Sequence, residues 1–345
     1  MRVVVVDAFA SSGRSLLEAL AQHPYIDQVI SVGDPSLALA KTELHVDFVK
    51  PRSTEEFRKL FQNADAVVYA GQAFNWFNRR ASVDILARLE AVCRGLATAG
   101  IHNFVCGLSV GAYAPAPMGV SVREDWPTSG VPGSHLSHRL SQAERLIQRF
   151  HEEHPVIRTV SLRMAPVVGP VDSAAPSIFE RWGAAVVGRY LLGHLLDRTH
   201  RPVLPDVGSH MFQVVHVADM ADAFCRSVTE SVIGPYNIAG QPFTSRHLAE
   251  SVSARTLPMS PLGLSRVFRL ARGLGLHSME PQSFDLALRC PVVDTSHARE
   301  ELGWTPRHDM ATVLESFADV LSAERNQPSC RGTGRVSGAR STQWS

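Results

Sequence analysis

The stretch Arg-Val-Val-Val-Val-Asp-Ala-Phe-Ala-Ser-Ser-Gly at residues 2–13 places four valines directly before a turn of small residues. The valines predict a buried strand, and residues 15–22 predict a helix. Further strands are predicted at 29–32, 66–69, 104–107 and 158–162, with helices at 55–61, 85–98 and 142–151. Such alternation is typical of an α/β fold in which helices cover both faces of a parallel sheet.

The turn after the first strand is where a dinucleotide fold holds a pyrophosphate against a helix N-terminus. If Gly13 is the last glycine of a Gly-x-x-Gly-x-x-Gly pattern, the first two positions fall on Asp7 and Ala10. A carboxylate at Asp7 would repel the pyrophosphate unless it turned away. Asp34 follows the second strand and suits the acid that binds an adenosine ribose and selects NAD. A plain turn residue is the alternative for Asp34.

These features predict a Rossmann-like doubly wound parallel sheet with NAD as its cofactor. The predicted cofactor-binding residues are Ala8, Ala10, Gly13, Asp34, Ala70 and Gly71. The predicted Rossmann-like domain spans residues 1–170. Residues 211–230 are also expected to belong to it. Residues 171–325 mainly form a smaller C-terminal α+β substrate domain. Residues 326–345, rich in Ser, Gly, Arg and Thr, are expected to be a disordered tail.

Composition limits the possible functions. The chain has 345 residues, 45% of them hydrophobic and 19% charged, with a formal net charge of +1, which indicates a soluble globular protein without a basic face for nucleic acid. The first residues lack the apolar region of a signal peptide, so a cytoplasmic location is expected. The apolar stretch 182–196 is interrupted by Arg189 and His194 and is too short to span a bilayer, so no transmembrane segment is predicted.

Several motifs together resemble the extended short-chain dehydrogenase/reductase family, in its NAD-dependent epimerase/dehydratase branch, over roughly residues 1–322. They are ADAVVY at 64–69, FVCGLSVGAY at 104–113, LRMAPVVGP at 162–170, VHVADMADA at 215–223, YNIAG at 236–240, and DTS at 294–296 with ELGWTP at 301–306. The resemblance implies an oxidoreductase that acts on a nucleotide sugar or a related small molecule. It also implies pairing as a homodimer.

The catalysis implied by the resemblance uses a tyrosine as acid and base, a lysine four residues later, and a serine that orients the substrate oxygen. The lysine matters because a nearby cation lowers the pKa of a phenol. Ser109 matches the serine, but the tyrosine and lysine positions fall on Leu136 and Leu140. No shift of register helps, since no tyrosine lies between Tyr113 and Tyr190 and the last lysine is Lys59. The standard mechanism is therefore not expected here.

Other residues leave alternatives open. His135 and His138 flank Leu136 and are candidate substitute bases, or else exposed polar residues of a first helical turn. Ser109 is equally suited to cap a strand end. His216 and Asp219 are interpreted as structural, with Asp219 as a helix N-cap.

At the level of the whole chain, residues 262–276 predict a basic amphipathic helix, either a lid or a face for an anionic membrane or a phosphorylated substrate. The main hypothesis is an oxidoreductase with an atypical mechanism. The alternative is a catalytically inactive relative that senses a nucleotide or binds a partner.

Overall fold

The computed structural model describes residues 1–8, 10–33, 46–49, 54–71, 79–169, 203–251, 253–273 and 286–315. Asp34, the apolar stretch 182–196 and the tail 326–345 lie outside the described residues, so the predictions made for them stay predictions.

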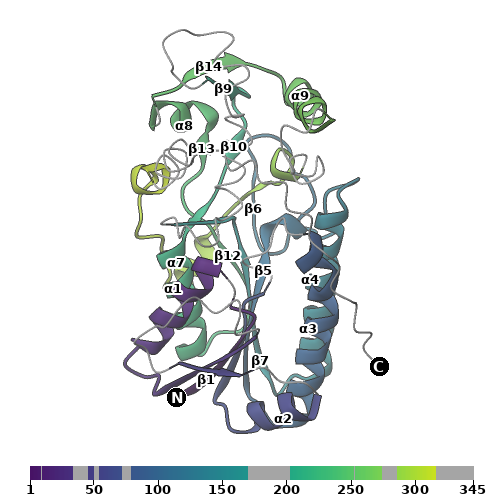
Figure 1. Ribbon diagram of the computed structural model, residues 1–345, viewed down its shortest axis with the longest axis vertical. Helices are drawn as coiled ribbons and strands as arrows, with labels where there is room; N and C mark the ends of the chain where they lie inside the picture. Colours follow the sequence, from purple (N-terminus) through teal and green to yellow (C-terminus); the bar gives the residue numbers. More distant parts are fainter. Residues whose placement is uncertain are drawn as a thin grey trace, which may run out of the picture.

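A seven-stranded sheet forms the centre of the fold (Figure 1). Its strand order is β3-β2-β1-β4-β5-β7-β12, and every neighbouring pair is parallel. The strands are β1 Arg2–Val6, β2 Gln28–Val32, β3 Val46–Val49, β4 Ala66–Tyr69, β5 Asn103–Ser109, β7 Arg158–Met164 and β12 Gly234–Ile238. The order reverses between β1 and β4, which is where doubly wound folds bind their ligands. The predicted fold class is confirmed.

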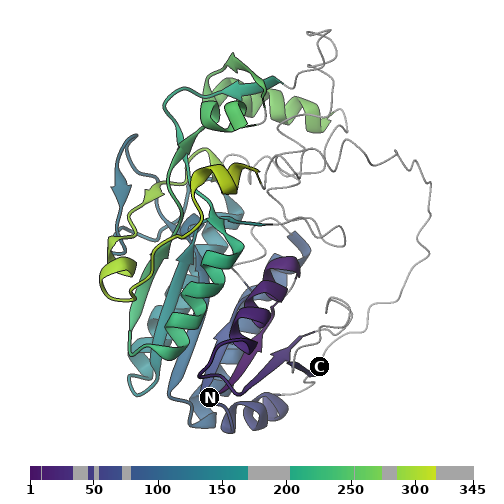
Figure 2. The same ribbon diagram turned by 90° about the vertical axis from the view of Figure 1, so that its left-hand side faces the viewer.

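Helices cover both faces of this sheet, as Figures 1 and 2 show. One face carries α1 Ala10–Ala21 and α7 Val217–Thr229. The other carries α2 Thr54–Gln62, α3 Arg79–Ala99 and α4 His135–Glu153. The side chains of β1 alternate between the two cores, with Val3 and Val5 on the α1 side and Val4 and Val6 on the α3 side. All four valines are fully buried, which explains the continuous apolar run in the sequence.

The remaining elements lie largely beyond the carboxyl ends of the strands (Figure 1). Short strand pairs are β6 Ser121–Val122 with β15 Val292–Val293, β8 Val167–Val168 with β11 Val215–His216, β9 Val203–Asp206 with β14 Arg255–Pro258, and β10 Met211–Phe212 with β13 Phe243–Thr244. The helices are η2 Val110–Ala112, α8 Ser245–Ser251, α9 Pro261–Gly273 and α11 Ser296–Glu300. Phe243, Leu264 and Phe268 belong to a separate apolar core in this part.

The predicted basic amphipathic helix corresponds to α9. Leu264 and Phe268 are buried, whereas Leu262 and Leu270 are exposed. Among the helices in the described ranges, none has the length and apolar character to cross a membrane.

Candidate dinucleotide and substrate site

The turn between β1 and α1 is tight and depends on its glycine. A Cβ added to Gly13 would lie 2.4 Å from the carbonyl carbon of Ala8, so only a glycine fits without moving the backbone. Asp7 has a φ of 62°, in the left-handed region where glycine is usual and aspartate is tolerated. Gly13 therefore packs closely against Ala8, and Asp7 adopts a backbone conformation that glycine usually takes.

The Asp7 side chain is turned towards helix α3 and is neutralised there. Arg88 donates from Nε to Asp7 Oδ2 over 2.8 Å and from Nη2 to Oδ1 over 2.5 Å. The Asp7 residue is only 2% exposed. Burial raises the pKa of the Asp7 carboxyl, and the Arg88 guanidinium opposes that shift. The unfavourable charge expected from the sequence is thus compensated by an arginine from another element.

Ala70 and Gly71 follow β4 on the other side of the switch point. The Ala70 amide donates to the Val6 carbonyl over 2.9 Å, which extends the ladder between β1 and β4. A Cβ on Gly71 would lie 2.9 Å from Tyr69 Oη and 3.1 Å from Asp7 Cβ. The structure therefore brings Gly71 and Asp7 together where β1 and β4 end, and the cofactor-binding role of Ala70 and Gly71 stays a prediction.

These residues fit the pyrophosphate of a dinucleotide. Helix α1 begins at Ala10, directly after the turn, and the N-terminal end of a helix favours an anion. Ala8 and Gly13 allow close backbone packing, and the Asp7 charge is paired. The ribose-binding role of Asp34 stays a prediction.

Ser109 lies at the end of β5 with its hydroxyl engaged locally. Ser109 Oγ accepts a hydrogen bond from the Gly111 amide over 3.0 Å and caps η2. The residue is 1% exposed. Ser137 on α4 reaches the same turn, because its Oγ accepts from the Val131 amide over 2.7 Å and donates to the Gly111 carbonyl. The geometry matches the capping alternative, and a catalytic role for Ser109 stays a prediction.

Leu136 and Leu140 stand one turn apart on α4 and occupy apolar surroundings. Leu140 is buried. Leu136 is partly buried against a cluster that includes Val110, Tyr113 and Val131. Both side chains therefore contribute packing at the two positions where proton-transfer groups were expected.

The two histidines near Leu136 are exposed at the start of α4. At about 100° per residue, His138 lies about 200° around the helix from Leu136, and His135 about 100°. The helix therefore directs His138 away from the stripe formed by Leu136 and Leu140. His135 lies closer to that stripe.

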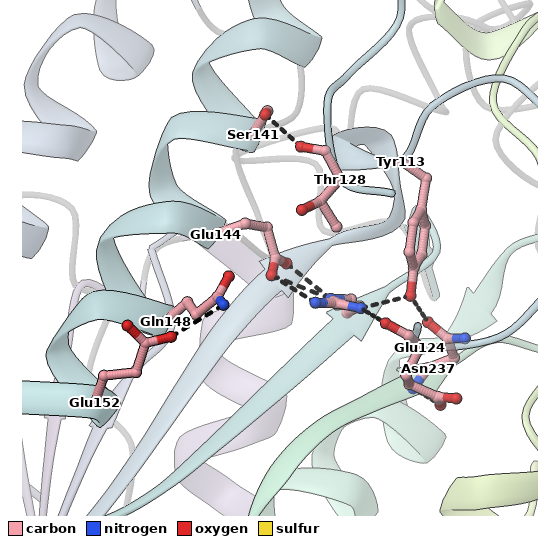
Figure 3. Close-up of polar contacts among 9 residues, drawn as sticks. Tyr113, Glu124, Thr128, Ser141, Glu144, Gln148, Glu152 and Asn237 are labelled. Atoms are coloured by element: carbon pink, nitrogen blue, oxygen red, sulfur yellow. Dashed lines mark hydrogen bonds and ion pairs between the residues drawn. The ribbon is translucent and has the colours of Figure 1, made fainter. Parts of the chain in front are cut away.

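A buried polar network continues the α4 stripe one turn beyond Leu140 (Figure 3). Arg163 on β7 donates from Nε to both oxygens of Glu144, each over 3.1 Å, and from Nη2 to Oε2 over 3.0 Å. Its Nη1 donates to Tyr113 Oη over 2.8 Å and to the Glu124 carbonyl over 2.6 Å. Tyr113 in turn donates to Asn237 Oδ1 over 2.7 Å. The network joins α4, β7 and β12.

The charged groups of this network are buried and are paired with each other. Burial raises the pKa of Glu144, and Arg163 opposes the shift. Burial also raises the pKa of the Tyr113 phenol above its ordinary value, while Arg163 again opposes it. Tyr113 is therefore a neutral hydrogen-bond donor near neutral pH and a poor base. Sequence reasoning did not identify this network, because Tyr113, Arg163 and Asn237 come from three separate motifs and Glu144 lies outside all of them.

The start of α7 differs from the sequence prediction. His216, not Asp219, is the N-cap, with Nδ1 accepting from the Ala218 amide over 3.3 Å. Asp219 lies within the first turn and accepts from the amides of Arg307 and His308, each over 3.1 Å. The assignment of Asp219 as a cap was wrong because its carboxylate binds a segment distant in sequence. The structural interpretation of both residues agrees with these contacts.

The strand order and the helices on both faces define a doubly wound α/β protein with a Rossmann-like sheet. The family model for the NAD-dependent epimerase/dehydratase family matches residues 9–239, and the chain belongs to this family.

Solved structures of similar fold include sugar-nucleotide epimerases. UDP-glucose 4-epimerase from Stenotrophomonas maltophila, with bound NAD and formylated UDP-arabinopyranose, has a TM-score of 0.67 and 17% identity and covers 94% of this chain and 99% of its own. UDP-glucose 4-epimerase from Thermus thermophilus, in complex with NAD, has a TM-score of 0.64 and 18% identity over 93% and 99% of the two chains. At these identities the likeness shows the fold alone.

A curated relative, the uncharacterized protein y4nG of Sinorhizobium fredii, is 29% identical over 127 residues. The match covers 34% of this chain and 32% of the relative. The chain therefore spans about a third of the length of this curated relative.

Proposed function

We propose that the protein binds a nicotinamide dinucleotide, NAD(H) in preference to NADP(H), at the β1–α1 turn. There it serves as an epimerase/dehydratase-like oxidoreductase for a nucleotide sugar or a related small molecule. Family membership supports the class of reaction. The names of the structural neighbours support the class of substrate.

The observation that supports the proposal is the packing of Gly13 in the β1–α1 turn, together with the backbone conformation and paired charge of Asp7. Gly13 packs against the Ala8 backbone as a phosphate-binding loop requires. Asp7 adopts a glycine-like φ, and its carboxylate is neutralised by Arg88.

In the proposed complex the backbone of Ala8 and the amides at the start of α1 hold the pyrophosphate, and Gly71 leaves room beside Asp7. The bound NAD supplies a hydride acceptor. Proton transfer does not involve Leu136 or Leu140, which have no ionisable group. Ser109, His135 and His138 stay the proposed catalytic residues, and His135 is favoured over His138 by its place on α4.

Calorimetric titration with NAD, NADH, NADP and NADPH tests the proposal before any substrate is known. We expect NAD(H) to bind with a Kd in the micromolar range, about −8 kcal/mol, and the Asp34→Ala variant to lose most of this affinity. Absence of binding by all four dinucleotides up to millimolar concentration would contradict the proposal.

A second function is favoured by the packing of Leu136 and Leu140. A protein with two leucines at the proton-transfer positions suits binding without turnover, as a nucleotide sensor, a scaffold or a partner for another protein. Single-turnover absorbance measurements separate the two functions. A change in nicotinamide absorbance with a UDP-sugar supports the oxidoreductase, whereas tight NAD binding with no change for any sugar nucleotide supports the binding role.

A further inference from the structure

Helix α9 has a defined start and one face that is buried in the protein. Ser260 precedes the helix, and its Oγ accepts a hydrogen bond from the Gly263 amide over 3.1 Å. Pro261 is the first helical residue, a position that suits proline. Leu264 and Phe268, one turn apart, are buried in the apolar core of this part of the fold. The helix is therefore held on the protein with a fixed face directed outwards.

That outward face exposes large apolar side chains. Leu262 is 74% exposed and Leu270 is 66% exposed. Val267 on the same helix and Leu257 on the preceding strand β14 are also exposed. Ten large hydrophobic side chains are exposed among the described residues, and four of them lie in the short stretch 257–270. Single exposed apolar side chains are normal, whereas a concentration of them marks an interaction surface.

Arginines stand beside these leucines on the same face of α9. At about 100° per residue, Leu262, Arg266 and Leu270 fall within an arc of about 80° around the helix. Arg269 lies about 20° outside this arc, next to Leu262. Both Arg266 and Arg269 are exposed. The outward face of α9 is therefore apolar and cationic at once.

The formal charge of the sequence around α9 has one sign. Between Glu250 and Glu280 the chain has no aspartate or glutamate, but it has four arginines: Arg255, Arg266, Arg269 and Arg272. The segment between the two glutamates thus carries a formal charge of +4, whereas the whole chain carries +1. Strand β14 and helix α9 lie together at the top of Figure 1, far from the N-terminus. This end of the molecule is suited to a partner that is negatively charged and partly apolar.

We propose that the outward face of α9 rests on the surface of an anionic lipid bilayer. Leucine side chains that enter such a surface leave water, and the guanidinium groups beside them bind lipid phosphates. A free anion would use the arginines and leave the leucines in water, whereas an anionic bilayer uses both. The helix lies along the surface, because no helix in the described ranges can cross a membrane. The inference goes beyond the proposed function and does not depend on it.

Co-sedimentation of the full chain with lipid vesicles tests the proposal. The probes are vesicles of phosphatidylcholine alone and vesicles of phosphatidylcholine with about 30% phosphatidylserine, an anionic lipid that attracts basic segments. At low salt we expect the protein to sediment with the anionic vesicles and not with the neutral ones. Binding should be lost at about 1 M salt, where charges are screened beyond about 3 Å.

Two variants separate the apolar contribution from the cationic one. The double variant Leu262→Ser/Leu270→Ser should lower the affinity for anionic vesicles about tenfold or more, because two apolar side chains no longer enter the bilayer. Arg266→Gln should lower it about fivefold, the effect of one basic residue near an anionic surface. All three side chains are exposed, so the variants are expected to fold, and circular dichroism checks this.

The matched controls change exposed residues far from α9. The double variant Val156→Ser/Ile233→Ser removes two exposed apolar side chains that precede β7 and β12, at the amino ends of these strands. Arg94→Gln removes an exposed guanidinium from α3. Both controls should bind anionic vesicles as tightly as the unmodified protein.

Three results would overturn the proposal. The first is a failure of the unmodified protein to sediment with anionic vesicles at low salt. The second is an equal loss of affinity in the control variants and the α9 variants. The third is an effect of Leu262→Ser/Leu270→Ser on self-association alone, measured by sedimentation velocity without lipid, which would make this face an interface between copies of the chain. Titration with NAD is a separate measurement, so none of these results decides the dinucleotide function.

Discussion

At the scale of single residues, one part of the β1–α1 turn could be predicted from the sequence, and another part is known only from the structure. The valine run and Gly13 were sufficient to place a dinucleotide-type turn. The charge of Asp7 was expected to oppose a phosphate, and its partner could not be predicted. Arg88 lies 81 residues further along the chain, and no local pattern connects the two positions.

The substitution Gly13→Ala tests the close packing of the turn. The new Cβ would lie 2.4 Å from the Ala8 carbonyl carbon, so the backbone must move. We expect a loss of about 1–3 kcal/mol in the free energy of unfolding, measured by urea denaturation, together with weaker dinucleotide binding. Gly273→Ala is the control, since among the described residues outside its own helix none comes within 4 Å of its added Cβ. Equal effects of both substitutions would argue against a special role for Gly13.

The ion pair between Glu144 and Arg163 gives a second prediction at this scale. Glu144→Ala leaves the buried guanidinium without its carboxylate, and we expect a loss of about 3–5 kcal/mol in the free energy of unfolding. Glu90→Ala removes a carboxylate from an exposed pair with Arg94, 3.9 Å apart, and should cost less than about 1 kcal/mol. Urea denaturation of both variants measures the difference. Similar small losses would show that the buried network contributes little.

At the scale of elements, the sequence predicted the positions of the central strands well and the ends of helices poorly. The strand predicted at 66–69 coincides with β4, because this apolar run begins directly after Asp65 and ends just before Ala70 and Gly71. The helix predicted from Gln142 begins at His135 instead. Its true start depends on Ser134, whose hydroxyl accepts from the Ser137 amide over 3.3 Å. The spacing of apolar residues gives no information about such a polar cap, so it does not predict where this helix begins.

The start of α7 predicts a dependence of stability on pH. Burial lowers the pKa of His216 below 6.5, and the stacked ring of His308, with centroids 3.7 Å apart, lowers it further, while Asp219 opposes the shift. The folded protein therefore resists protonation of His216. Its contribution to stability is fully present above about pH 6.5 and is lost as the pH falls from there through the lowered pKa.

His216→Asn is the variant that checks this dependence. Asparagine is a good N-cap and does not titrate. The free energy of unfolding, measured in urea between about pH 5 and pH 7.5, should fall less steeply on acidification in the variant than in the unmodified protein. Identical slopes would show that His216 is not responsible.

At the scale of the whole molecule, Asp219 connects the sheet domain to a segment nearly ninety residues later. Its backbone carbonyl accepts from Trp304 Nε1 over 2.9 Å, and Trp304 is 1% exposed. Asp219 belongs to the motif VHVADMADA at 215–223, and Trp304 belongs to the motif ELGWTP at 301–306. The family resemblance gives the order of these two motifs along the chain but not their positions in space. Their contact depends on the completed fold, so no reading of either motif alone could predict it.

Asp219→Ala removes the acceptor for the amides of Arg307 and His308. We expect faster hydrogen exchange at these two amides, by tenfold or more, while the strands of the central sheet keep their protection. Asp309→Ala is the control, because the Asp309 carboxylate accepts a local hydrogen bond from the Thr312 amide, over 2.9 Å. Unchanged exchange in Asp219→Ala would contradict the anchoring role.

The contact of Trp304 with the sheet domain also has a consequence for synthesis on the ribosome. Trp304 packs in the same core cluster as Val3 and Val5 of the first strand. At about 5–20 residues per second, roughly 15 to 60 seconds separate the translation of these two ends. During that interval the core around Val3 and Val5 lacks Trp304, so this core can be completed only after nearly the whole described chain has been synthesised.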